Sequence, residues 1–304
     1  MEKFDLAIAY VWEYDEDFVN LIEKKLQESG ITTFKINYHN IRKVTRLIEN
    51  KELQFATFLD RASDVEPEFE PLSRLLIRRK TRIFNPYKKV KHAIDKASMH
   101  LEFITAGLNV PYSIIIPPHN EEKEVYISLD DLAILGRPFI IKPCNTTGGG
   151  IGVVTGAETL KEVYEERITN LNDKYILQQK IYPSIMDGKR LWFRCFWAFG
   201  KAILTWWDDQ THIYSEIADD ELNNFGLKKM YSITKEIAKI TELDFFSTEI
   251  VLTNEKKFIV IDYVNDQCDM RLKSKHIDGV PDNVLLQIIE NLKAKVLETT
   301  NSGV

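Results

Sequence analysis

The chain has 304 residues, of which 44% are hydrophobic and 28% charged, and its formal net charge at pH 7 is −6. This is the composition of a globular protein with enough chain for two domains or three lobes, and the acidic balance argues against a general nucleic-acid binder, which would show a basic face. We expect neither a secretory leader nor a membrane span, because no suitable apolar run is present. Three widely spaced cysteines favour buried free thiols in a reduced, cytoplasmic setting over a disulfide framework or a zinc site.

The first part of the chain alternates strand and helix patterns. Apolar alternation predicts strands, and a period near 3.6 predicts helices. The predicted strands cover 4–11, 32–37 and 55–59, and the predicted helices cover 15–29 and 41–49. This order indicates a small α/β domain with a parallel sheet. Asp60 and Arg61 directly follow the third strand, at the edge where ligands bind in open α/β sheets, although a plain surface role fits Arg61 equally well.

The remainder of the chain reads as antiparallel hairpins with helices, which is typical of an α+β rather than a doubly wound fold. An acidic, proline-bearing loop is expected at 63–71. The predicted helices cover 87–106, 128–135 (with Ser128 as N-cap), 159–171, 222–243 and 282–299. The predicted strands cover 110–117, 175–181, 190–199, 201–207, 245–252 and 258–264.

A glycine-rich segment separates two apolar runs within 138–153. The first run contains Lys142, and glycines then stand at 148, 149, 150 and 152. Glycines permit positive φ and allow a phosphate to approach the backbone. Their N–H groups can form an anion-binding concavity beside the lysine charge. A glycine-rich hairpin whose lysine points into water fits the same pattern.

Three charged residues lie on predicted strands of the second half. Arg194 stands in an aromatic strand, where a half-buried charge needs an anion partner, either a ligand or an internal salt bridge. Glu249 and Asp262 lie on two strands joined by a tight turn, and antiparallel pairing brings such positions side by side. Two neighbouring carboxylates repel each other, so Mg²⁺ is their natural partner. Solvent-facing strand acids are the alternative.

From about residue 83 to 297, the order of these parts resembles the ATP-grasp superfamily, in which two α+β lobes clamp ATP after a small α/β domain. The resemblance rests on the motifs at 95–98 and 106–111, on the lysine strand at 140–143 and on the segment 175–181. It implies an N-terminal α/β domain over 1–85. It also implies a linker helix and first lobe over 86–177 and a second lobe over 178–304.

The resemblance implies an ATP site in which the segment 178–181 reads the adenine edge. The ATP-binding residues that it implies are Lys96, Lys142, Gly148, Gly149, Gly150, Gln178, Gln179, Ile181 and Asp187. Lys142 and Arg194 would act on the transferring phosphate and are the predicted catalytic residues. Gln178 stands where the family often has a glutamate. Asp187 would contact the ribose, although an acidic turn residue before Gly188 is an equal interpretation.

The resemblance also implies that two Mg²⁺ ions are held by Glu249, Asp262 and Asn265. The usual spacing of acid-x-asparagine is here acid-x-x-asparagine. Either a bulge re-aims Asn265, or Asp266 or Tyr263 occupies a shifted register. The family's acid two residues before Arg194 is replaced by Trp192. Arg61 and Arg271 are predicted to bind a substrate carboxylate through bidentate forks.

These features predict an ATP-dependent carboxylate–amine ligase that works through an acyl-phosphate and releases ADP and phosphate. Its expected partners are a small-molecule or peptide carboxylate and an amine, with no nucleic acid and no membrane. Two alternatives remain open. One is an ATP-grasp kinase for small molecules, and the other is a non-catalytic nucleotide-binding module.

Overall fold

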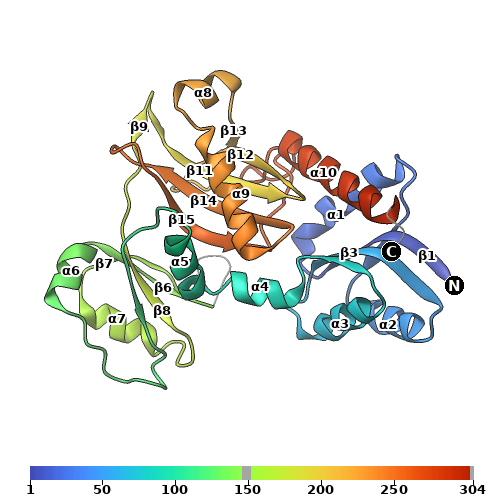
Figure 1. Cartoon of the computed structure of the whole chain (residues 1–304), viewed down its shortest axis with the longest axis horizontal. Helices are drawn as coiled ribbons and strands as arrows, with labels where there is room; N and C mark the ends of the chain where they lie inside the picture. The colour runs from blue at the N-terminus through green and yellow to red at the C-terminus, as the bar shows by residue number, and fades with distance from the viewer. Residues whose placement is uncertain (146–151, 302–304) are drawn as a thin grey trace. The chain divides into compact units, whose positions relative to one another are not determined.

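The computed structural model describes residues 1–145 and 152–301, which gather into two compact units (Figure 1). The first unit comprises residues 1–91, 195–247 and 266–304, and the second comprises 92–194 and 248–265. The bounds of these units differ from the three predicted parts, 1–85, 86–177 and 178–304, which stay a prediction. In the described part of the chain, no helix is both long and apolar enough to cross a membrane.

The first unit contains a four-stranded parallel sheet of order β2-β1-β3-β4. Its strands are β1 (Glu2–Tyr10), β2 (Thr33–Ile36), β3 (Leu53–Arg61) and β4 (Arg82–Phe84). The predicted α/β domain with a parallel sheet is therefore confirmed. The short strand β4 was not predicted, because three residues are too few to show a period.

Helices cover both faces of this sheet because side chains alternate along each strand (Figure 1). The helices are α1 (Glu16–Gln27), α2 (Ile41–Glu49), α3 (Glu70–Arg78) and α10 (Asp282–Asn301). Leu6 and Ile8 of β1 pack in one apolar cluster with α1 and α10. Ala7 and Ala9 point the other way and pack in a second cluster with α2 and α3.

A buried ion pair stands at the end of β3. Arg61 Nε and Nη2 donate to the Asp15 carboxylate at 2.9 and 2.6 Å, and Nη2 also donates to Cys268 O at 3.1 Å. Arg61 and Asp15 are 3% and 2% exposed. Burial opposes the charge of the guanidinium, yet Asp15 raises its pKa. The ion pair therefore accounts for Arg61 without a substrate, and its assignment as a substrate residue stays a prediction.

Removing one member of this pair should destabilise the first unit. Asp15→Ala leaves a buried guanidinium without its counter-charge, so we expect a loss of about 3–5 kcal/mol in the free energy of unfolding. Replacing both partners, as in Asp15→Leu with Arg61→Met, should cost less than Asp15→Ala alone. Urea denaturation of the three proteins measures this difference, and equal losses in the single and double variants would contradict it.

The first unit also contains a further hairpin and two further α-helices. Strand β12 (Lys201–Trp207) pairs antiparallel with β13 (Tyr214–Glu216) and neighbours the end of β11 (Trp192–Ala198), which begins in the second unit. The single helix predicted at 222–243 is wrong. The chain instead forms two helices, α8 (Asp219–Asn224) and α9 (Lys229–Thr241). Gly226 lies between them with φ +65°, a conformation that ends the first helix.

The second unit is built on a four-stranded antiparallel sheet of order β5-β8-β6-β7. Its strands are β5 (Ser113–Ile116), β6 (Phe139–Pro143), β7 (Val154–Ala157) and β8 (Tyr175–Gln179). Helices α6 (Leu129–Leu135) and α7 (Leu160–Arg167) accompany it. The predicted hairpin on either side of the glycine segment is confirmed by the pairing of β6 with β7. The predicted N-cap is also confirmed, because the Ser128 side chain accepts a hydrogen bond from Asp131 N.

The helix predicted at 87–106 is two helices, α4 (Tyr87–Ala93) and α5 (Lys96–Thr105). Asp95 interrupts them as the N-cap of α5, where its carboxylate accepts from Ala97 N at 3.0 Å. This break puts Lys96 in the first turn of α5. The second unit also holds the small hairpin of β9 (Ile185–Met186) and β10 (Lys189–Arg190). It holds β15 (Phe258–Asn265) and most of the neighbouring β14 (Phe245–Leu252), which begins in the first unit. Two short 3₁₀ helices, Glu13–Asp15 and Pro67–Phe69, belong to the first unit.

Candidate functional site

Lys142 is a buried cation on β6 of the second unit. Its residue is 9% exposed, and Nζ donates to Ile261 O at 3.3 Å. Burial lowers the pKa of the ammonium group, and the nearby charge of Lys96 lowers it further, whereas Asp262 and Glu249 oppose the shift. A lysine held this way presents a desolvated positive charge, which interacts strongly with an anion.

Glu249 on β14 is held by two side chains from β11. Arg194 Nη2 donates to Glu249 Oε1 at 2.5 Å, and Trp192 Nε1 donates to Oε2 at 2.9 Å. Trp192 and Arg194 are two residues apart on one strand and therefore share a face of the sheet. Of the two anion partners that the sequence allowed for Arg194, the structure shows an internal salt bridge. The indole N–H of Trp192 takes part in the same arrangement, where an acid was expected.

Asp262 on β15 completes a cluster of opposite charges. Although burial opposes ionisation, Lys142, Lys96 and Arg194 hold the pKa of its carboxyl below the usual range. The backbone N–H of Lys96 donates to Cys144 O at 3.1 Å, which holds the backbone of this residue beside the end of β6. Three cations and two carboxylates of the second unit thus lie close enough to act on one another. The sequence placed these five residues at one site, and the structure brings them together.

The oxygen ligands of this cluster suit Mg²⁺. Magnesium in proteins takes one or two carboxylates together with substrate phosphates and water. Glu249 and Asp262 carry carboxylates, and Asn265, the third predicted ligand, is the last residue of β15. Among the residues that the structure describes, no group of three or more histidine, cysteine or acidic side chains gathers as metal ligands.

Asp266, the alternative to Asn265, belongs to a different group of acids. In the first unit it lies near Asp64 and Asp60, and it is 5% exposed. Burial, reinforced by the charge of Asp64, raises the pKa of Asp266 to about 8. The choice between Asn265 and Asp266 as a metal ligand stays a prediction.

The side chain of Gln178 on β8 belongs to a buried chain of hydrogen bonds. Gln178 is 1% exposed, and its Nε2 donates to the hydroxyl of Tyr263 at 3.1 Å. The same hydroxyl lies 2.6 Å from His100 Nδ1 on α5. Gln178 Oε1 is buried and has no hydrogen-bond partner among the described residues. A buried acceptor without a donor is costly, so this oxygen suits a ligand N–H.

The next residues of the predicted adenine segment differ in what their backbones do. Gln179 N donates to Tyr112 O at 2.8 Å, so this N–H is already used inside the sheet. Ile181 lies just beyond the end of β8 and is partly buried. The assignments of both residues to the nucleotide stay predictions.

The predicted phosphate-binding glycines, Gly148, Gly149 and Gly150, lie outside the described residues. The described residues on either side of them make specific contacts. On the entering side, Asn145 N and Nδ2 donate to the Asp173 carboxylate, at 3.0–3.1 Å and 2.8 Å. On the leaving side, Gly152 has φ +71°, and a Cβ there would stand 3.3 Å from Pro143 Cγ. Only glycine combines this backbone conformation with this close approach.

Two further predicted residues already have structural roles. Asp187 (φ +50°) and Gly188 (φ +75°) form the two-residue turn between β9 and β10, where Met186 pairs with Lys189. Positive φ at both positions is what such a tight hairpin turn requires. Arg271 donates to Asp269 at 2.8 Å and to Asp278 at 2.8 Å. Ribose binding by Asp187 and substrate binding by Arg271 stay predictions.

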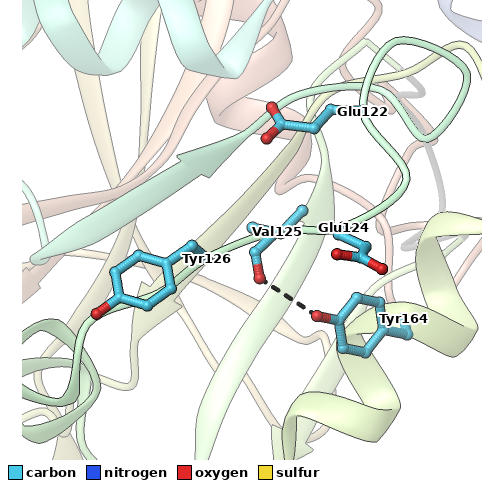
Figure 2. Close-up of a pocket in the computed structure, with 5 residues that line it drawn as sticks. All are labelled: Glu122, Glu124, Val125, Tyr126 and Tyr164. Carbon is cyan, nitrogen blue, oxygen red and sulfur yellow. Dashed lines mark hydrogen bonds between the residues drawn. The ribbon is translucent and has the colours of Figure 1, made fainter.

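A hollow of the second unit lies away from the cluster of opposite charges. It has a volume of about 580 Å³, and its lining is shown in Figure 2. The lining residues are Glu122, Glu124, Val125, Tyr126 and Tyr164. Tyr164 donates its hydroxyl proton to Val125 O at 3.2 Å. None of the predicted site residues lines it.

His100 was missed by the sequence analysis, although one signal could have found it. It lies four residues after Lys96 on α5, and residues at this spacing share a helix face. A lysine predicted to reach phosphates therefore marks a face on which a second polar residue merits attention. The contact of Trp192 with Glu249 had no comparable signal, since it depends on which strands become neighbours.

No protein-family model and no curated protein matches the chain, whereas solved structures do. The chain is similar to a RimK-domain ATP-grasp protein from Sphaerobacter thermophilus, with a TM-score of 0.64, 15% identity and coverage of 96% of this chain and 99% of that one. It is also similar to D-alanine–D-alanine ligase from Bacillus anthracis, complexed with ATP, with a TM-score of 0.63, 14% identity and coverage of 100% of both chains. For the ATP-grasp ligase PsnB, complexed with a minimal precursor, the TM-score is 0.64 and the identity 12%, with coverage of 98% of this chain and 99% of that one. The chain therefore has the ATP-grasp fold, as the sequence predicted.

Proposed function

We propose that this chain is an ATP-dependent carboxylate–amine ligase that works through an acyl-phosphate and releases ADP and phosphate. One observation carries the proposal. On an ATP-grasp fold, the second unit gathers three cations, Lys96, Lys142 and Arg194, around the carboxylates of Glu249 and Asp262. Such a set is suited to hold a polyphosphate together with its metal.

The nucleotide would lie between the buried amide of Gln178 and the lysines. The exocyclic amine of adenine can donate to Gln178 Oε1, which is a buried acceptor with no partner among the described residues. Lys142 and Lys96 would neutralise the phosphates. The glycines at 148–150 would contribute backbone N–H groups to the same phosphates, as the family resemblance implies.

Glu249, Asp262 and Asn265 would hold Mg²⁺, which supplies charge neutralisation and orientation of the phosphates when bound. Glu249 already holds Arg194 at 2.5 Å, and this ion pair limits where the guanidinium can point. Arg194 and Lys142 would then stabilise the charge that develops on the transferring phosphoryl group. A preorganised pair of cations needs little rearrangement at the moment of transfer.

The proposed reaction has two steps. A substrate carboxylate oxygen attacks the γ-phosphorus of ATP, the bond to the β-phosphate oxygen breaks, and ADP leaves. An amine then attacks the acyl carbon, loses a proton, and expels phosphate with the former carboxylate oxygen. Similar structures include a ligase of two D-alanines and one complexed with a precursor peptide, so we propose an amino-acid, small-molecule or peptide acid with an amine partner. Arg61 and Arg271 remain the proposed carboxylate contacts.

Isotope transfer tests this proposal directly. The chain is incubated with Mg-ATP, amines and a panel of ¹⁸O-labelled carboxylic acids, and products are analysed by mass spectrometry. We expect amide, ADP and phosphate in equal amounts, with one ¹⁸O atom in the phosphate. A phosphorylated metabolite without released phosphate would instead indicate a kinase. Absence of turnover with every acid and amine, from protein that binds Mg-ATP, would favour a non-catalytic module.

A further inference from the structure

The hydroxyl of Tyr263 stands between two buried side chains that come from different elements of the second unit. Gln178 Nε2 on β8 donates to it at 3.1 Å, and His100 Nδ1 on α5 lies 2.6 Å from it. Tyr263, His100 and Gln178 are 2%, 4% and 1% exposed. The rings of His100 and Tyr263 are also nearly parallel, with centroids 5.8 Å apart. All three side chains are thus held by packing as well as by hydrogen bonds.

The direction of this chain of hydrogen bonds depends on which ring nitrogen of His100 carries the proton. A phenol has one proton, and a neutral imidazole accepts at one ring nitrogen and donates at the other. Burial lowers the pKa of His100, which favours the neutral ring. Gln178 Nε2 donates to the Tyr263 oxygen, which leaves the phenol proton for His100 Nδ1. This direction requires that neutral His100 carries its proton on Nε2, because the other tautomer would donate from Nδ1 and reverse the chain.

With its NH₂ group used by Tyr263, the amide of Gln178 has its oxygen left for another partner. Gln178 Oε1 is buried and has no hydrogen-bond partner among the described residues. If the amide were rotated by 180°, Nε2 would take the place of Oε1. Oε1 would then face the Tyr263 oxygen, whose proton is used in the hydrogen bond to His100, so two acceptors would meet. The two orientations of the amide would suit opposite ligands, a donor in the first case and an acceptor in the second.

We propose that Tyr263, backed by His100, is a positioning residue that fixes the amide of Gln178 with its oxygen toward the purine, so that the site selects a 6-amino over a 6-oxo purine. The inference rests on the proposed ATP site and adds to it the means by which the base is chosen. A purine with an oxygen at position 6 would meet Gln178 Oε1 with two acceptors face to face. Buried acceptors left unpaired are what rejects such an analogue.

Removing the Tyr263 hydroxyl tests the role of this residue. In Tyr263→Phe the amide of Gln178 is released and can turn its NH₂ group toward a 6-oxo purine. Binding of Mg-ADP and Mg-IDP is measured by calorimetry, because neither nucleotide can complete the reaction. The wild-type chain should prefer ADP by about tenfold or more, and Tyr263→Phe should bring this ratio close to one, a change of about tenfold.

Two further variants separate positioning from general damage. Tyr175→Phe removes another buried hydroxyl from β8, one that donates to Glu166 O at 2.8 Å, and it should keep the wild-type ratio. Gln178→Glu added to Tyr263→Phe should restore the preference for ADP, because a carboxylate presents an acceptor in either orientation. A structural defect would weaken both nucleotides by the same factor and would not be rescued.

The possible results divide clearly. An unchanged ratio in Tyr263→Phe, or equal losses for the two nucleotides, would overturn the positioning role while leaving the nucleotide site intact. A wild-type chain that binds neither nucleotide would overturn the proposed function, and this inference with it. Should Tyr263→Phe fail to fold, ¹⁵N NMR of the wild-type chain decides. An unprotonated His100 Nδ1 is expected, and a protonated Nδ1 would contradict the proposed direction.

Discussion

Lys142→Met is expected to lower kcat/KM for ATP by about a hundredfold to a thousandfold, the usual cost of removing one charge-stabilising group from a preorganised site. Lys142 is 9% exposed and has Asp262, Glu249 and Lys96 as charged neighbours. Methionine keeps much of the length of the side chain and removes the charge. The loss should therefore fall on phosphate binding and transfer rather than on packing.

The same substitution should make the nucleotide-free protein more stable. Because burial lowers the pKa of Lys142, the native state binds this proton less tightly than the unfolded chain does. The resulting cost grows as the pH falls below the ordinary lysine pKa of about 10.4, and methionine does not incur it. We therefore expect Lys142→Met to unfold at a higher temperature than the wild type at pH 7. The difference between the two melting temperatures should become smaller toward alkaline pH.

ADP release and thermal melts measured on the same samples check both effects. Lys161→Met, at a side chain 81% exposed on α7, is the matched control and should change neither quantity. Turnover of Lys142→Met at the wild-type rate would remove this lysine from the active site. A lower melting temperature together with lost turnover would point to misfolding instead of a missing charge.

Asp262→Asn should remove the dependence of ATP binding on Mg²⁺ and lower turnover by about a thousandfold or more, because it deletes one of two proposed carboxylate ligands. The nucleotide-free protein should be less stable, in contrast to Lys142→Met. Lys142, Lys96 and Arg194 hold the pKa of Asp262 low, so the carboxylate contributes stability above the unfolded-state aspartate pKa. That contribution is lost as the pH falls through the native pKa.

Calorimetric titration of ATP with and without Mg²⁺ tests the metal assignment. The wild-type chain should bind ATP more tightly when Mg²⁺ is present, and Asp262→Asn should show little difference. Asp130→Asn, an exposed acid on α6, serves as the control and should behave as the wild type. A full Mg²⁺ effect in Asp262→Asn would place the metal on other ligands.

The sequence predicted those parts of the fold that depend on local patterns. Helix α2 begins and ends where its periodicity does, at Ile41 and Glu49. The hairpin of β6 and β7 follows from apolar runs on either side of glycines. The helix breaks at Asp95 and at Gly226 were missed, since no proline stands there and a single glycine or aspartate is tolerated within helices. Their local signals, a capping residue and a glycine, were nevertheless present.

The candidate site was predictable to the extent that charge and spacing define it, and its pairings were not. Asp15 and Arg61 are far apart in sequence, so their ion pair depends on how the strands pack. Arg194 and Glu249 likewise meet because β11 neighbours β14. Asp187 is different, because aspartate before glycine between short strands is itself a hairpin signal. The sequence accordingly offered the turn as an equal interpretation of Asp187, and the structure shows this turn.

The central claim is that the lysines and the acids of the second unit bind one triphosphate. A crystal structure of the chain with Mg²⁺ and a non-hydrolysable ATP analogue tests this claim most directly. The account predicts that Lys142 Nζ lies within hydrogen-bonding distance of a phosphate oxygen and that a metal ion bridges Asp262 and the same phosphates. A triphosphate bound away from both residues would contradict it.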